Sequence, residues 1–142
     1  MKTIEECLTF LLGKAQQHAQ QIAKARLQPY GVTPVQYALL HLLFEKDGQQ
    51  SSELGDRLRL DSATMTGLLD RLVQNGFIER HSNPKDRRVN RIYLTNRSIE
   101  LQGILYEKMQ EAHSEALKGF TEEETVLLKS MLARIGLEKA KI

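Results

Sequence analysis

The residues with the clearest potential for chemistry lie in a short basic segment. Between Arg80 and Arg97 the sequence holds six basic side chains and one acidic one, Asp86, a local charge of +5. The 142-residue chain as a whole carries only +2, so the remainder is slightly acidic. An acidic body with one concentrated basic segment is the charge distribution expected of a nucleic-acid-binding protein. A solvated basic loop is the simpler alternative.

Small polar side chains form a second group, on one face of an expected helix from Asp61 to Asn75. This face carries Ser62, Ala63, Thr64, Thr66, Gly67, Asp70 and Arg71. Small side chains near a helix N-terminus allow the helix to enter a DNA major groove, where they contact base edges and thymine methyl groups. Free backbone N–H groups at the same end can meet phosphate. An ordinary solvated helix face is the alternative.

The basic segment suits a different task. Arg87 and Arg88 carry guanidinium groups, which are attracted to the negative potential of a narrow minor groove. Asp86 would repel DNA, but it can pair with Arg88 and hold that side chain in position. A surface ion pair of little energetic value is the alternative for Asp86. Asn90 and Arg91 are expected to contact phosphate or to be simple solubilising residues.

The hydrophobic pattern predicts the elements that must position these residues. Apolar residues at helical spacing predict one long amphipathic helix over 4–27. The segment Thr33-Pro34-Val35-Gln36 combines a capping box with proline at the first helical position. It predicts a second helix that reaches about Glu45 and, being apolar on nearly every side, lies at the centre of the fold.

Two shorter helices and a hairpin are expected next. Ser51 is a candidate cap for a helix that buries Leu54 and Leu58. Asp61 is the second cap, with Leu60 and Met65 as a hydrophobic staple, and its helix is expected to bury Met65, Leu68, Leu69, Leu72 and Val73. This pair is typical of a helix-turn-helix. Residues 77–82 and 88–95 then predict a β-hairpin with a basic tip, which makes the unit a winged helix.

Helical spacing resumes at Asn96, and the Thr121–Glu124 capping box opens a last helix with Leu128, Met131, Leu132 and Ile135 inward. We expect one domain over residues 1–142 of mostly α (α+β) class, a winged helix-turn-helix with N- and C-terminal dimerisation helices. The DNA-binding part spans about 33–95, and 1–30 and 96–142 form the dimerisation helices. Their apolar stripes exceed what a small monomer can bury, which favours a homodimer.

Composition excludes several other classes. The longest apolar stretch, Tyr37 to Phe44, is eight residues and is broken by His41, whereas a membrane-spanning helix needs about 20. The first six residues have no apolar segment behind their charge, so no secretory signal is expected. The single cysteine, Cys7, forbids an internal disulfide and fits a reducing cytoplasm.

Several segments closely resemble the signature of the MarR family of bacterial transcription regulators. They are 61–66, 68–72 and 75–80 for the helix-turn-helix, 83–88 with 94–95 for the wing, and 33–37 for the start of the second helix. The likeness covers nearly the whole chain. It implies a dimeric winged helix in which Ser62, Thr64, Thr66 and Gly67 face the major groove and Arg88 enters the minor groove. Family members often carry a larger side chain where this chain has Gly67.

The resemblance also implies an inducer cavity between the dimerisation helices and the DNA-binding part, often for small aromatic or phenolic compounds. Tyr30, Tyr37 and His41 lie near the second helix and could line it. A buried tyrosine or histidine satisfied by a neighbouring backbone group is the alternative.

One branch of the family senses organic hydroperoxides through an N-terminal cysteine, so Cys7 raises oxidation sensing as an alternative. Alignment on Thr33 and Gln36 puts Thr9 at that branch's reactive position, and Gly13 and Ala23 where its hydrogen-bonding tyrosines stand. A thiol needs such partners or nearby positive charge to become reactive, and Glu5 and Glu6 do the opposite. An inert Cys7 is favoured.

An enzyme is not expected. The four histidines are widely separated, and the sequence has no HExxH, CxxC or phosphate-binding glycine loop. A metal site from His41, His113 and a glutamate is conceivable, but we expect no metal and no cofactor. The leading hypothesis is a ligand-responsive repressor on a pseudo-palindromic operator. An oxidation-sensing regulator and a non-sensing architectural protein that packs DNA are the alternatives.

Overall fold

The computed structural model describes residues 1–138, with every side chain in that range except those of Arg87 and Arg88. The helices are α1 (Leu8–Leu27), α2 (Pro34–Glu45), α3 (Ser51–Leu58), α4 (Ser62–Gln74), α5 (Asn96–Ala116) and α6 (Glu122–Gly136). The strands are β1 (Gln49–Gln50), β2 (Ile78–Asn83) and β3 (Asp86–Leu94), and short 3-10 turns occupy Ile4–Glu6 and Gln28–Tyr30.

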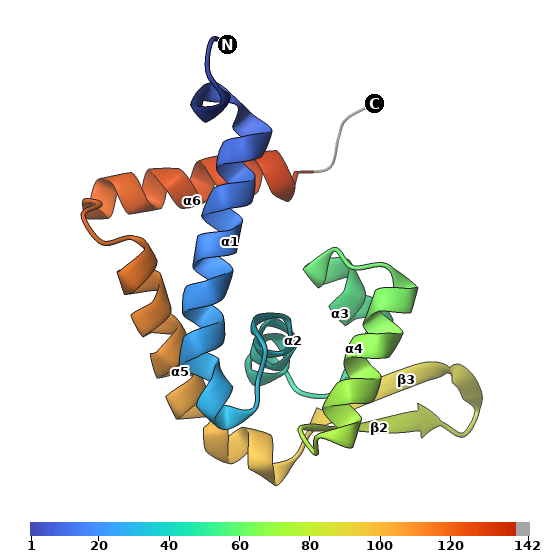
Figure 1. The fold of residues 1–142 in the computed structure, drawn as a ribbon. Helices are drawn as coiled ribbons and strands as arrows, with labels where there is room; N and C mark the ends of the chain where they lie inside the picture. The colour runs from blue at the N-terminus through green and yellow to red at the C-terminus, as the bar shows by residue number, and fades with distance from the viewer. Residues whose placement is uncertain (139–142) are drawn as a thin grey trace.

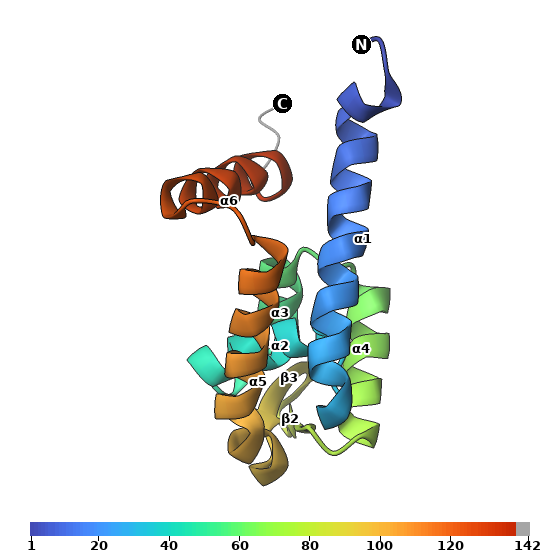
Figure 2. The same cartoon turned by 60° about the vertical axis from the view of Figure 1, so that its left-hand side comes forward.

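Helices from the two ends of the chain run side by side and carry the rest of the fold. Figures 1 and 2 show α1 beside α5, with α2 next to this pair and the α3–α4 pair and the β2–β3 hairpin beyond α2. Arg26 of α1 bonds to Glu111 of α5 at 3.0 Å and to Glu115 at 3.3 Å. The wing and α6 lie toward opposite ends of the molecule.

The predicted central helix is confirmed. Thr33 caps α2, and its hydroxyl accepts from the Gln36 N–H at 3.2 Å while the Gln36 side chain accepts from the Thr33 N–H at 3.0 Å. Leu39, Leu40 and Leu43 are at most 1% exposed. The core around them joins apolar residues of α1, α3, α4, β3 and α5 and the turn after α4: Leu27, Leu54, Leu72, Phe77, Ile92 and Leu105.

The predicted hairpin is present and gains a third strand. The sheet has the order β1-β3-β2 and is antiparallel, with Ile78 opposite Leu94 and Gln49 opposite Ile92. The sequence did not predict β1, because two glutamines carry no hydrophobic alternation. Gly48 leads into it with φ +73°, and a Cβ there would lie 2.9 Å from Tyr93 Cε1. Only glycine fits this approach of the chain to β3.

Three sequence predictions about the helices need correction. The N-terminal helix is interrupted, because Cys7 is extended (φ −77°, ψ 118°) between the 3-10 turn and α1. Gln50 rather than Ser51 precedes α3 as its cap, in a capping box with Glu53. Val73 is 39% exposed rather than buried. It lies about 100° around the helix from the buried Leu72, which places it outside the core-facing stripe.

The C-terminal helix also differs from expectation. Leu128 of α6 is half-buried, but Met131, Leu132 and Ile135, predicted to face inward, are 43%, 43% and 57% exposed. The physical reason is that α6 fully buries none of its residues against the described remainder of the chain, which it meets near its end where Arg59 donates to the carbonyl of Leu137 at 3.0 Å. A single chain therefore presents an apolar face of α6 without covering it. No helix within residues 1–138 combines the length and apolar character needed to cross a bilayer.

Candidate nucleic-acid interface and adjoining cleft

The start of α4 is fixed by the predicted cap. Asp61 Oδ1 accepts from the backbone N–H of Thr64 at 2.8 Å, and Asp61 Oδ2 accepts from the Thr64 hydroxyl at 2.9 Å. The hydrogen bond from the Thr64 N–H is the main reason that the pKa of Asp61 lies below its ordinary value. Ser62, Ala63 and Thr64 of the first turn are exposed. The cap thus leaves the small side chains of the first turn free to contact another molecule.

The threonines on this face have a defined hydrogen-bonding polarity. The Thr66 hydroxyl donates to the carbonyl of Ser62 at 2.9 Å, and the Thr64 hydroxyl donates to Asp61. Because both hydroxyl protons are used within the chain, the threonine oxygens are left as acceptors beside their methyl groups. Such a surface suits the amino groups of adenine or cytosine and the methyl group of thymine.

Gly67 lies in the middle of the face and is half-buried. A Cβ at this position would be 3.3 Å from Nη2 of Arg71, so the Arg71 side chain extends back along α4 over the glycine. The structure therefore brings together Ser62, Ala63, Thr64, Thr66, Gly67 and Arg71 on the outer face of one helix.

A hollow of about 570 Å³ lies beside this face, lined by residues of α3, α4, β2 and β3. Arg80 of β2 enters it and forms an ion pair with Asp70 of α4 at 2.6 Å. Asn90 of β3 is half-buried and lines the same hollow. Sequence reasoning missed the Arg80–Asp70 pair, because residues ten apart show no periodic signal when they lie on different elements. The pair is a direct contact between β2 of the wing and α4.

Two other arginines of the basic segment also have partners in the fold. Arg91 donates from Nη1 to the carbonyl of Gly48 at 3.0 Å. Arg97 bonds to the carbonyl of Asn75 and lies 4.3 Å above the Phe77 ring. These contacts hold the chain before β1 and the turn after α4. The high local charge is therefore partly structural, while Lys85 at the hairpin tip is exposed.

The predicted minor-groove residues can be placed only by their backbone. Residues 87 and 88 belong to β3, directly after the turn at Pro84–Lys85, and Asp86 is opposite Asn83. The side chains of Arg87 and Arg88 lie outside the described residues, as does the predicted Asp86–Arg88 pair. These roles remain predictions.

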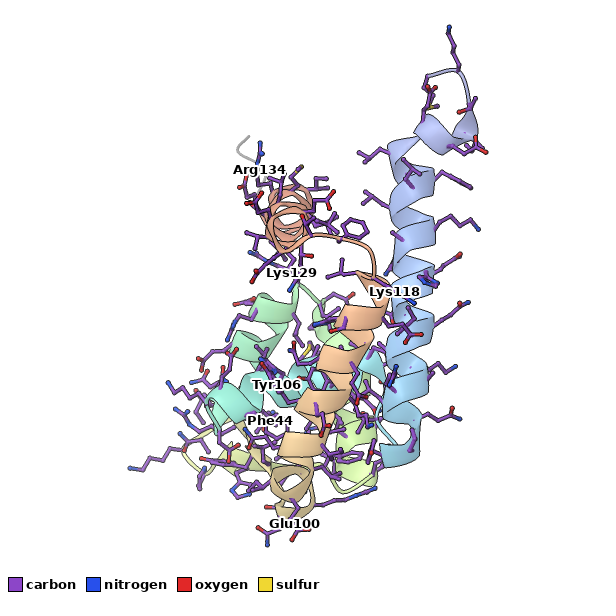
Figure 3. The ribbon with its side chains drawn as sticks, turned by 90° about the vertical axis from the view of Figure 1, so that its left-hand side faces the viewer. Phe44, Glu100, Tyr106, Lys118, Lys129 and Arg134 are labelled. Atoms are coloured by element: carbon purple, nitrogen blue, oxygen red, sulfur yellow. The ribbon has the colours of Figure 1, made fainter. Side chains whose placement is uncertain are left out.

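A second hollow, of about 510 Å³, lies between α2 and α5. We call it the α2–α5 cleft; its lining includes Tyr37, His41, Phe44 and Glu45 of α2, and Ile99, Gln102, Gly103 and Tyr106 of α5. Figure 3 looks onto this side of the molecule, with Phe44 near Tyr106, Lys118 just after α5, and Lys129 and Arg134 on α6. No lysine or arginine is among the described lining residues.

The structure joins two of the three predicted ligand-contact residues. The Tyr37 hydroxyl lies 3.2 Å from His41 Nδ1, so these side chains are partners within the α2–α5 cleft. Burial, and to a smaller extent Tyr106, raises the pKa of the Tyr37 phenol, which keeps it protonated. Tyr30 lines a different hollow, beside Arg97 and Leu101, and is not brought together with Tyr37.

The structure adds no supporting contacts to the oxidation-sensing and metal-binding alternatives. Cys7 is half-buried at the residue before α1, next to Glu6, and its proposed redox role remains untested. Within residues 1–138 no group of three or more histidine, cysteine, aspartate or glutamate side chains could hold a metal ion. His41 and His113 accordingly belong to no such group within these residues of a single chain.

A helix-turn-helix followed by a β-hairpin defines the class of this protein as a winged helix. The MarR family model matches residues 32–89. The helix-turn-helix-type regulator YsmB of Bacillus subtilis is 30% identical over 95% of this chain and 90% of its own length. MhqR, a transcriptional regulator of the same species, is 28% identical over 92% of this chain and 90% of its own length.

A solved structure gives the same result. The MarR mutant from E. coli in complex with operator DNA superposes with a TM-score of 0.82 and 27% identity, over 91% of this chain and 93% of that one. The chain belongs to the MarR family. The resemblance and the fold class predicted from the sequence are thereby confirmed.

Proposed function

We propose that this chain is a sequence-specific DNA-binding repressor that acts as a homodimer and leaves its operator when a small aromatic or phenolic ligand binds. The observation that carries the DNA-binding part is the exposed, small-residue start of α4 beside a hairpin wing. The similar MarR from E. coli was solved with operator DNA, which supports the same use of this face. We propose no catalytic role. We propose a cytoplasmic location, because operator DNA is in the bacterial cytoplasm.

The proposed contacts divide by groove. Ser62, Ala63, Thr64, Thr66 and Gly67 meet base edges in the major groove, where the threonine oxygens accept hydrogen bonds. Arg71 and Arg91 approach phosphates, and the wing carries Arg87 and Arg88 to the minor groove with Asp86 as the positioning residue. Two copies of α4 then enter successive major grooves about 34–36 Å apart on a pseudo-palindromic operator.

The homodimer is supported by uncovered apolar side chains at both ends of the chain. Eight of them are exposed by 43% to 65%: Ile4, Leu8, Leu11, Val126, Leu127, Met131, Leu132 and Ile135. Large apolar side chains left exposed in this number at the two ends of a chain favour an interface between copies. We propose that residues 1–30 and 96–142 form the dimerisation part and that 33–95 form the DNA-binding part.

The ligand is proposed to occupy the α2–α5 cleft, which lies between these two parts. Its apolar lining includes Phe44, Ile99 and Tyr106, and Tyr37, His41 and Gln102 offer hydrogen bonds. Because Glu45 is the acidic residue of the lining and no lysine or arginine is among its described members, a carboxylate ligand would meet like charge with no lysine or arginine to offset it. We therefore favour neutral phenols over aromatic acids.

Selection of bound duplexes from a random DNA pool tests the DNA-binding part. We expect one enriched pseudo-palindrome, bound about 10³-fold or more tightly than random duplex at the same salt. Binding without preference would instead support the architectural alternative. Release of DNA by peroxide in the wild type, but not in Cys7→Ser, would replace the ligand response with oxidation sensing.

A further inference from the structure

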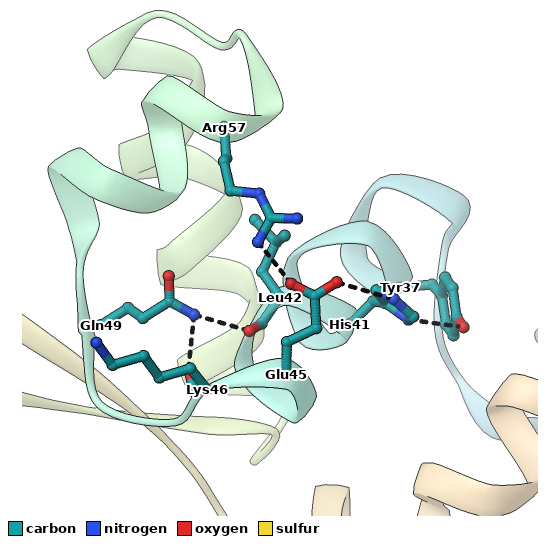
Figure 4. A network of polar contacts seen from close by, with 7 residues as sticks. All are labelled: Tyr37, His41, Leu42, Glu45, Lys46, Gln49 and Arg57. Carbon is teal, nitrogen blue, oxygen red and sulfur yellow. Dashed lines mark hydrogen bonds and ion pairs between the residues drawn. The ribbon is translucent and has the colours of Figure 1, made fainter. Parts of the chain in front are cut away.

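A chain of polar contacts runs along α2 from the α2–α5 cleft to the helix-turn-helix (Figure 4). The Tyr37 hydroxyl lies 3.2 Å from His41 Nδ1, and His41 Nε2 lies 3.4 Å from Glu45 Oε1. The second oxygen of Glu45, Oε2, pairs with Nη1 of Arg57 at 2.5 Å. Three of these residues are spaced four apart on one helix, and Arg57 belongs to α3.

The direction of each hydrogen bond depends on its neighbour. An ionised carboxylate can only accept, so Glu45 favours the His41 tautomer with its proton on Nε2. His41 Nδ1 is then an acceptor, and the Tyr37 hydroxyl donates to it. A change at one nitrogen of the ring therefore changes what the other nitrogen offers.

Glu45 is held in an unfavourable place by these partners. It is the last residue of α2, where the helix dipole disfavours a negative charge, and the last turn of α2 has no basic residue. The hydrogen bond from Arg57 is the main reason that the pKa of Glu45 lies below its usual range, with His41 contributing less. The carboxylate thus depends on α3 and on the cleft together.

The polar contacts end at Arg57, close in sequence to the α4 face that is proposed to contact DNA. Arg57 lies in α3, which connects to α4 through the Asp61 cap. Gln49, just before α3, donates from Nε2 to the carbonyls of Leu42 and Lys46 at 2.7 and 2.6 Å. The end of α2 and the start of α3 are therefore joined by the Gln49 hydrogen bonds, and the Glu45–Arg57 pair adds a second contact between the two helices.

We propose that the Tyr37–His41–Glu45–Arg57 chain couples the α2–α5 cleft to α3, with Glu45 and Arg57 as positioning residues. The inference deepens the proposed ligand response and rests on it. An occupant that presents an acceptor to His41 Nδ1 draws the proton away from Nε2, and the ring then repels Glu45. Glu45 turns wholly to Arg57, and α3 shifts relative to α2. Protonation of His41 has the opposite effect, because it adds positive charge beside Glu45 in competition with Arg57.

A pH titration of the intact homodimer by NMR tests the coupling without any ligand. Among the described residues, Tyr37 and Glu45 of α2 contact His41, Arg57 of α3 pairs with Glu45, and Tyr106 of α5 lines the same cleft. We expect the Arg57 Nε–H signal and the amide signals of α3 to change with the same midpoint as the His41 ring, which His41→Gln identifies. Glu45 titrates separately in acid because its pKa is lowered.

Two variants and a matched control decide the outcome. Glu45→Gln and Arg57→Gln should each abolish the inflection in the α3 amides that follows His41, while the ring still titrates. Both side chains are substantially exposed, so the variants should fold. Glu107→Gln, an exposed acid on α5, should leave the inflection intact. The coupling is wrong if the α3 amide signals do not change at the midpoint of the His41 ring, or if they change in the same way in Glu45→Gln.

A titration with 4-methylphenol separates this inference from the proposed ligand response. We expect shifts at Tyr37 and Tyr106 that extend to α3 in the wild type and stop at the cleft in Glu45→Gln. If the phenol causes no shift at the cleft while the pH coupling is present, the coupling stands and the choice of ligand class fails. Equal α3 shifts in wild type and Glu45→Gln would overturn the coupling although the cleft binds phenol.

Discussion

At the residue scale, Gly67 occupies a position where stability and the proposed function oppose each other. Replacing a glycine inside a helix by alanine stabilises a protein by roughly 0.5–1 kcal/mol. The new Cβ would lie 3.3 Å from the flexible end of Arg71, which can move aside. The same methyl group would stand on the face proposed to approach the bases.

Gly67→Ala is therefore expected to raise the melting temperature and to weaken operator binding. Thermal unfolding and fluorescence anisotropy with the selected operator measure the two effects. Gly13→Ala is the matched control, because Gly13 is also helical, lies outside the α4 face and the α2–α5 cleft, and has nothing within 4 Å of its Cβ position. It should stabilise the protein without changing DNA affinity. Operator binding by Gly67→Ala as tight as that of the wild type would refute close approach at this position.

The wing gives a second prediction at this scale. Arg88→Ala should weaken operator binding by about 1–3 kcal/mol per protomer through lost minor-groove contact. Asp86→Ala should weaken it too, although it removes a negative charge, because Asp86 is proposed to position Arg88. Lys85→Ala, at the exposed tip, should reduce affinity for operator and random duplex alike. Tighter binding by Asp86→Ala at fixed salt would contradict the positioning role.

At the scale of elements, the turn before β1 is the most constrained connection between α2 and the sheet. Gly48 has φ +73°, and a Cβ there would lie 2.9 Å from the Tyr93 ring. Gly48→Ala is expected to cost about 1–3 kcal/mol from the backbone conformation alone, with the Tyr93 contact adding to it. Chemical denaturation measures the loss. A variant as stable as the wild type would show that the turn can relax.

The sequence predicted most elements of this fold because their signals are local. The capping boxes at Thr33 and Thr121, the Asp61 cap and the period-2 hairpin each lie within a few residues, and all are present. The N-terminal helix and Val73 were predicted from periodicity alone, which does not sense an extended residue such as Cys7 or the edge of a buried stripe.

The candidate site was less predictable, because its side chains meet across elements. The sequence identified the face of α4 and the His41–Tyr37 neighbours, which lie four apart on one helix. It could not show that Arg80 pairs with Asp70, that Arg91 bonds to Gly48, or that Arg57 reaches Glu45. Those contacts depend on how α3, α4 and the strands pack. Two of them show that Arg80 and Arg91 of the basic segment also have contacts within the fold.

At the scale of the whole molecule, the apolar end helices predict the assembly. Ile135→Lys, on the uncovered face of α6 and 57% exposed in the single chain, should shift sedimentation from a dimer toward the 16.2 kDa species at micromolar concentration. A buried unpaired charge at an interface is the physical cause. Gln74→Lys, exposed at the end of α4, is the control and should remain dimeric. A wild type that sediments only as a monomer would refute the proposed homodimer.

The last prediction concerns linkage between the proposed ligand and operator. Two α4 helices must keep a separation of about 34–36 Å to enter successive major grooves. A phenol in the α2–α5 cleft, beside Tyr37 and His41, acts only if it binds a conformation that lacks this spacing better than the DNA-competent one. Binding free energies are reciprocal, so operator DNA must weaken phenol binding by the same factor, expected to be about 5- to 150-fold.

Calorimetric titration of 4-methylphenol into the free homodimer and into its operator complex measures one side of this linkage. Anisotropy of labelled operator with and without saturating phenol measures the other. His41→Gln should reduce both factors together, because it interrupts the contact between the cleft and Glu45. If the phenol stabilises the protein but the operator affinity is the same with and without phenol, the cleft binds ligand without regulating DNA binding. Unequal factors would show that the phenol also binds at a second place.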